Sequence, residues 1–107
     1  NRERYLAAAQ AVRDGIRAAF DRLFERFDLL LRATAPFGAF RLDTPLTTEQ
    51  GCDMDYSTVC ESLAGLPAMS VPFSRDENGM PLGLQIAAPQ LCEGRMFAAG
   101  AYLEANR

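Results

Sequence analysis

The side chains that could do chemistry in this chain are hydroxyls, thiols and carboxylates, and they lack the bases that would activate them. The 107 residues contain no His, and all 11 basic residues are Arg. A Ser-His or Cys-His pair, a Schiff base and a serine-lysine dyad are therefore excluded within this sequence. We accordingly expect no catalytic residue here, and no nucleophile role for Ser57, Ser62 or Ser70.

The cysteines do not indicate a cofactor site. Cys52, Cys60 and Cys92 are odd in number and contain no C-x-x-C pair, and no His is available as a further ligand. This pattern argues against a zinc site and against a secreted disulfide framework. We expect reduced thiols, no metal site and no other cofactor.

Asp55 is the one candidate for ligand binding. It begins a stretch, Asp55–Ala64, that the sequence predicts to be a short helix, and its carboxylate is suited to cap that helix, worth on the order of 1 kcal/mol. A carboxylate is equally suited to hold a substrate ammonium, because a charge-assisted hydrogen bond outweighs a neutral one where water is excluded. The two roles are compatible, and the sequence leaves both open.

The first half of the chain predicts a long helix and a strand. From Arg2 to about Phe27, apolar residues recur every three or four positions, which marks one face of an amphipathic helix. These residues are Tyr5, Ala9, Val12, Ile16, Phe20, Leu23 and Phe27. The short apolar run 29–31 then indicates a buried, parallel-type strand. From Ala35 to Cys52 the sequence is rich in Pro, Gly and Thr, so we expect an irregular connection.

The second half predicts a hairpin between two helices. Gly65 and Pro67 follow the predicted helix at Asp55–Ala64 and prevent it from continuing. Strands at Ala68–Phe73 and Leu82–Ala87 are joined by a turn that contains an Asn-Gly step. A last helix runs from Glu93 to about Asn106. The predicted fold class is therefore α/β, with residues 1–107 forming a single partial domain and no internal linker.

The composition limits the kinds of partner that we expect for this chain. A hydrophobic fraction of 49% and a charged fraction of 23% are close to those of soluble globular proteins, so we expect a folded chain. The net charge is −3 and the arginines are scattered, so no nucleic-acid contact is expected. No apolar run approaches the roughly 20 residues of a membrane span. We expect a cytoplasmic protein, or one of an organelle matrix if a segment preceding Asn1 has been removed.

Two ordered motifs carry a family resemblance. Residues 62–72 read S-L-A-G-L-P-A-M-S-V-P, and residues 79–85 read G-M-P-L-G-L-Q. Together they resemble the carboxy-terminal block of the amidase signature family. Within it, the likeness is strongest to the glutamine-hydrolysing subunits of tRNA-dependent amidotransferases, because the long helix also matches, and it extends from Tyr5 to Glu104.

The resemblance implies a fold, an activity and partners. The chain would be the carboxy-terminal part of an amidase-signature fold and would contribute strands to a larger mixed sheet flanked by helices. In the family, a Lys and two Ser from an earlier Gly/Ser-rich motif perform catalysis, and none of these positions lies in this chain. The implied partners are therefore a complementary catalytic amidase portion, glutamine and the other components of an amidotransferase. Asp55 matches the acidic residue that holds the α-ammonium of glutamine.

Departures from the family pattern leave other hypotheses open. Ser62 replaces an Asn, Phe73-Ser74 replaces Cys-Gly, and Arg32 replaces a small residue near a strand end, where burial of its charge requires a partner. The chain would then be an inactive relic of the fold, kept for a structural or interaction role in a larger complex. The third hypothesis is part of an amidase for a small aryl or fatty amide, but such substrates offer Asp55 no α-ammonium.

Overall fold

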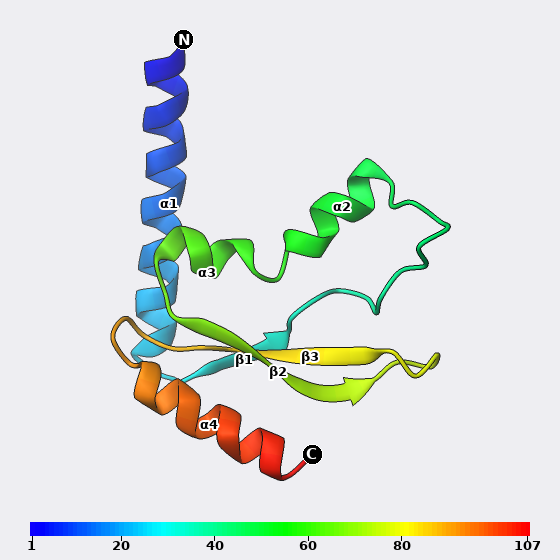
Figure 1. Ribbon diagram of the computed structural model, residues 1–107. Helices are drawn as coiled ribbons and strands as arrows, with labels where there is room; N and C mark the ends of the chain where they lie inside the picture. The colour runs from blue at the N-terminus through cyan, green and yellow to red at the C-terminus, as the bar shows by residue number, and fades with distance from the viewer.

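The computed structural model describes all residues, 1–107, and confirms the α/β class (Figure 1). A three-stranded sheet lies between α4 on one side and α1 and α3 on the other. In chain order the elements are α1 (Arg2–Phe24), β1 (Leu30–Ala33), α2 (Thr48–Asp55), α3 (Val59–Ala64), β2 (Ala68–Arg75), β3 (Pro81–Ala87) and α4 (Glu93–Ala105).

The sheet has the order β1-β3-β2 and is antiparallel throughout. The predicted hairpin is confirmed: β2 and β3 pair from Ala68 opposite Ala87 to Arg75 opposite Pro81, with one irregularity between Pro72 and Ser74. The strand expected at residues 29–31 is present as β1, but the expectation that it is buried and of the parallel type is wrong. β1 pairs with β3 in the antiparallel sense and is an edge strand, so Leu31 remains 56% exposed.

The turn of the hairpin is organised by a carboxylate. Asp76 Oδ1 accepts hydrogen bonds from the backbone nitrogens of Asn78 (2.9 Å) and Met80 (2.8 Å). The Asp76 nitrogen in turn donates to the Met80 carbonyl at 2.8 Å. Gly79 adopts a φ of 78°, whereas Asn78 does not have a positive φ. Within the Asn-Gly step, Gly79 alone therefore supplies the left-handed conformation that the turn needs.

The hydrophobic core lies between α4 and the sheet. It is formed by Val71, Ile86, Ala88 and Met96, all of which are at most 4% exposed. Gly100 allows α4 to approach β2 closely, because a Cβ at this position would lie 2.8 Å from Met69 Cε. The core follows the alternation of side chains along β3, in which Ile86 and its neighbours two residues away face one side of the sheet.

The long helix is held at its C-terminal half only. Arg13 Nε donates to the Leu63 carbonyl at 2.7 Å, and Phe20 stacks on Phe24 with ring centroids 6.3 Å apart. The N-terminal half projects away from the other elements (Figure 1), and Tyr5 and Val12 are 74% and 62% exposed. The predicted amphipathic helix thus exists, but no residue of α1 is buried.

The helix predicted at Asp55–Ala64 is shorter than expected: only Val59–Ala64 forms a helix, α3, and Asp55 belongs to a separate preceding helix, α2. Thr47 begins α2 with a capping box, in which its side chain accepts from the Gln50 nitrogen and the Gln50 side chain accepts from the Thr47 nitrogen. Helix α2 ends at Asp55, and α3 starts only at Val59. The irregular connection is therefore shorter than predicted, whereas the end of α3 at Gly65, with φ 71°, is confirmed.

One exposed ion pair lies in the connection between β1 and α2. Arg41 donates from Nε and Nη2 to the two carboxylate oxygens of Asp43, at 2.8 and 2.7 Å. The hydrogen bond lowers the pKa of Asp43 and raises the pKa of Arg41 from their ordinary values. Because both groups are solvent-exposed, water screens the pair, and it contributes little to stability.

The chain buries less surface than a self-contained domain of its mass. Its accessible surface is 7930 Å² and only 10 of 107 residues are buried. A compact protein of 11.8 kDa would expose about 5,900 Å². The radius of gyration is 16.3 Å, compared with about 13 Å for a compact domain of this length. The excess of about 2,000 Å² on this chain alone is larger than the roughly 800 Å² that each partner buries in a standard protein interface.

This surface predicts poor behaviour of the chain in isolation. β1 and β2 each have an unpaired edge, and large apolar residues such as Leu31 and Phe73 are half-exposed. Open edges and apolar patches favour self-association. We expect size-exclusion chromatography with light scattering to detect oligomers at high concentration, and calorimetry to give a broad transition. A monodisperse monomer with one cooperative transition would contradict this expectation.

Candidate functional site

A polar cleft lies between α3 and the sheet. Its volume is about 330 Å³. Four hydroxyl groups, one carboxamide and one carboxylate line it, and they belong to Thr34, Thr58, Ser62, Ser70, Gln85 and Glu61. The strand residues among them lie on the side of the sheet that faces α3, because side chains alternate along each strand and Ile86 faces α4.

The floor of the cleft is a pair of hydroxyls above a glycine. Thr34 Oγ1 and Ser70 Oγ lie 2.6 Å apart and share a hydrogen bond. A Cβ at Gly83 would lie 2.5 Å from Ser70 Oγ and 3.0 Å from Thr34 Oγ1. Gly83 is therefore required, because no side chain fits beneath the two hydroxyls.

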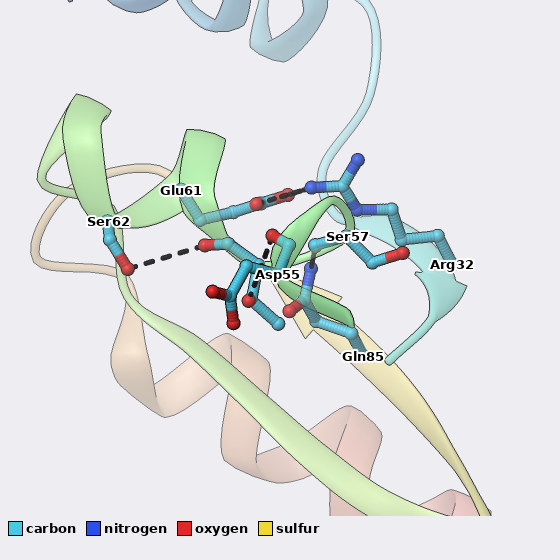
Figure 2. Close-up of polar contacts among 7 residues, drawn as sticks. Arg32, Asp55, Ser57, Glu61, Ser62 and Gln85 are labelled. Atoms are coloured by element: carbon cyan, nitrogen blue, oxygen red, sulfur yellow. Dashed lines mark hydrogen bonds and ion pairs between the residues drawn. The ribbon is translucent and has the colours of Figure 1, made fainter. Parts of the chain in front are cut away.

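The loop between α2 and α3 is tied to the central strand. Gln85 Nε2 donates to the Ser57 carbonyl at 2.9 Å, and Gln85 and Ser57 are 4% and 8% exposed (Figure 2). Because a buried carbonyl without a partner costs about 1 to 3 kcal/mol, this bond fixes where the loop crosses the sheet. Ser57 thus anchors the loop through its backbone carbonyl.

An ion pair joins α3 to β1. Arg32 Nη2 donates to both carboxylate oxygens of Glu61, at 2.6 and 2.5 Å (Figure 2). The Glu61 side chain is 5% exposed and the Arg32 side chain 37% exposed. Glu61 is the charge partner that Arg32 requires at this position. Arg32 Nε is also buried, and it makes no hydrogen bond.

Asp55 lies beside the cleft and does not cap a helix. It is the last residue of α2, and its carbonyl accepts from Thr58 N at 3.0 Å and from Thr58 Oγ1 at 3.3 Å. Its carboxylate is exposed and makes no hydrogen bond or ion pair (Figure 2). The predicted N-cap role is therefore wrong, because the predicted helix begins only at Val59 with Thr58 as its N-cap, and Asp55 instead ends the preceding helix, α2.

The cleft can bind a polar molecule, but its own residues do not form a nucleophile. Hydroxyls and a carboxamide both donate and accept hydrogen bonds, so they suit an amide or a zwitterion. A hydroxyl needs an adjacent base to attack a carbonyl, and the chain contains no His or Lys. The three cysteines are free, and no three Cys, Asp or Glu side chains lie close enough together to hold a metal.

None of the four helices combines the length and apolar character that a membrane span needs.

Sequence reasoning missed several residues of the cleft. Thr34, Glu61 and Gln85 were not singled out as site residues, although Gln85 and Gly83 occupy alternate positions of β3 on the face opposite Ile86. A polar residue in an otherwise apolar strand indicates that its side chain has a buried hydrogen-bond partner. The contacts themselves join residues 28 to 36 positions apart, which local patterns do not reveal.

Known proteins share both the sequence pattern and the fold of this chain. The family model described as Amidase matches residues 1–97. The chain is 45% identical over 104 residues to the A subunit of glutamyl-tRNA(Gln) amidotransferase from Maricaulis maris, covering 94% of this chain and 21% of that protein. It is 42% identical to the protein of the same name from Nocardia farcinica, covering 98% of this chain and 22% of the relative.

Solved structures share the fold. The crystal structure of the glutamyl-tRNA(Gln) amidotransferase A subunit from Thermotoga maritima superposes with a TM-score of 0.83 at 33% identity, covering 89% of this chain and 21% of that one. A crystal structure of an amidase superposes with a TM-score of 0.82 at 29% identity, covering 99% and 25%. The chain thus spans about a fifth of the length of the curated relatives it matches. On the family match over most of its residues, the chain belongs to the amidase family.

Proposed function

We propose that this chain is the substrate-binding part of an amidase domain that hydrolyses glutamine within a tRNA-dependent amidotransferase, with Asp55 holding the α-ammonium of glutamine. The observation that carries the proposal is the Asp55 carboxylate, which is exposed, has no partner and adjoins a hydroxyl-lined cleft. A complementary amidase portion would supply the catalytic Ser and Lys residues, and further amidotransferase subunits would complete the complex. The cytoplasm, or an organelle matrix, is the compartment we expect.

The position of Asp55 argues against a purely structural role. The C-terminal end of a helix carries partial negative charge, so a carboxylate there is unfavourable by about 0.3 to 1 kcal/mol. Asp55 stands at this end of α2 and gains no hydrogen bond in return. A residue that weakens its own helix is better explained by a ligand. A cation that binds there is attracted both by the carboxylate and by the helix end.

The proposal separates this chain from an amidase that acts on aryl or fatty amides. Such substrates carry no ammonium, so an unpaired carboxylate next to the cleft would serve no purpose. The alternative of an inactive relic is supported by Ser62 and Phe73-Ser74, where the chain departs from the family pattern. Ser62 is bound to its own helix, since its hydroxyl donates to the Thr58 carbonyl at 3.3 Å.

The isolated chain is expected to lack amidase activity. It contains neither a base for a nucleophile nor a Lys, so glutamine, asparagine and simple amides should be turned over at the rate of the buffer alone. The measurement is ammonia release by a highly purified sample. Appreciable turnover that follows the chain through an orthogonal purification step would contradict the expectation.

Asp55→Asn tests the proposed ligand contact, with the complementary amidase portion present. The change keeps the size of the side chain and removes the charge that pairs with the ammonium. Loss of a charge-assisted bond costs about 1.5 to 3 kcal/mol, so kcat/KM for glutamine should fall about ten- to 150-fold. For the des-amino analogue of glutamine it should hardly change. The melting temperature should stay the same or rise slightly, because the negative charge leaves a helix C-terminus.

Asp53→Asn is the matched control for Asp55→Asn. Asp53 is also exposed and lies two positions earlier in α2, so both changes remove one negative charge from the same helix. We expect the control to keep the wild-type preference for glutamine over its des-amino analogue. An equal loss on both substrates in Asp55→Asn, or the same loss in both variants, would leave the relic hypothesis ahead.

A further inference from the structure

The Arg32–Glu61 ion pair is the one charge contact of the chain in which the carboxylate is buried. Both oxygens of the Glu61 carboxylate accept from the same guanidinium nitrogen, and Glu61 is 4% exposed. The two residues are 29 positions apart in the sequence, and they connect α3 to β1. Their contact therefore sets the position of α3 relative to the edge of the sheet.

The energetics favour a role in positioning over a role in stability. Removing the Glu61 carboxylate from water costs free energy, and its attraction to the partly exposed Arg32 guanidinium offsets that cost only in part, so apolar residues of similar size are often as stable or more stable. The site offers such an alternative, because Arg32 and Glu61 also border an apolar cavity of about 340 Å³ that is lined by Ile16, Phe20 and Leu23. An apolar pair would lose this directional contact, because a hydrogen-bonded carboxylate and guanidinium hold each other at a defined distance and angle.

The pair and a second contact hold the segment that carries Asp55. Helix α2 has no buried residue, so its packing does not fix its place. Residues 56–58 link it to α3, and within this link Ser57 is bound by Gln85 while Thr58 is bound by the Asp55 carbonyl. Glu61 follows one turn later and is bound to Arg32. Asp55 is thus positioned through these contacts and not through its own.

We infer that the Arg32–Glu61 pair positions Asp55 for recognition of the substrate ammonium. The inference rests on the proposed function. Neither residue is catalytic. The pair acts through α3 and the link at residues 56–58, and it positions the glutamine site without contacting the substrate.

The test compares variants of the chain assembled with its complementary amidase portion. The double variant Arg32→Met, Glu61→Leu should keep a melting temperature close to that of the wild type. Its preference for glutamine over the des-amino analogue, measured as the ratio of kcat/KM values, should fall at least about tenfold, mainly through a higher KM for glutamine. By hydrogen exchange, the amide of Thr58 should be at least about tenfold less protected, because the link is no longer held.

Two further variants complete the comparison. Glu61→Gln leaves the Arg32 charge without a carboxylate and should lower the melting temperature. The exchanged pair Arg32→Glu, Glu61→Arg should regain part of the glutamine preference and of the Thr58 protection, because it restores a directional bond between the same elements. A double apolar variant with wild-type preference and wild-type protection would overturn the inference and reduce the pair to a stabilising contact.

The experiment distinguishes this inference from the proposed function. If Asp55→Asn changes the glutamine preference but the apolar pair does not, the positioning role is wrong and the proposed function stands. If Asp55→Asn leaves the preference unchanged, the proposed function is wrong. In that case the inference is wrong as well. The hydrogen-exchange protection of the Thr58 amide then reports only on the order of the link at residues 56–58.

Discussion

The architecture of this chain depends on the two faces of a single strand. β3 is paired on both sides, and its residues alternate between an apolar layer and a polar one. Ile86 is fully buried in the core with α4, whereas Gln85, its neighbour, binds the loop that precedes α3. A shift of β3 by one residue would exchange the two layers and destroy both. The register of this strand therefore fixes the core and the cleft together.

Local sequence patterns were sufficient where structure is decided locally. The apolar period of α1, the hairpin at residues 68–87 and the end of α3 at Gly65 all follow from spacing and turn chemistry. The start of α2 was missed, since its signal is a capping box at Thr47 inside a segment without period. β1 was expected to be parallel because an apolar run indicates burial but carries no information about the direction of a partner strand.

The site was predictable only in part for a related reason. Asp55 was found through a family motif, but its supposed role as a cap followed from placing the start of the helix at Asp55, whereas that helix, α3, has Thr58 as its N-cap. Arg32 was recognised as a charge in need of a partner, and only the three-dimensional contact identifies Glu61. Thr34 and Ser70 meet above Gly83 across 36 positions. Contacts of this range are properties of topology and not of local composition.

The projecting half of α1 has a consequence for the cost of assembly. A helical segment that lacks tertiary contacts is held only by its own hydrogen bonds and by the helix that it continues, and each added residue gains little. Residues 2–12 receive no such support, so their order depends on the helix–coil balance of their own sequence. A partner that covers Tyr5, Leu6 and Val12 would gain apolar contact and at the same time bear the entropic cost of ordering this segment. Binding there would therefore favour the helical form of this segment over frayed forms.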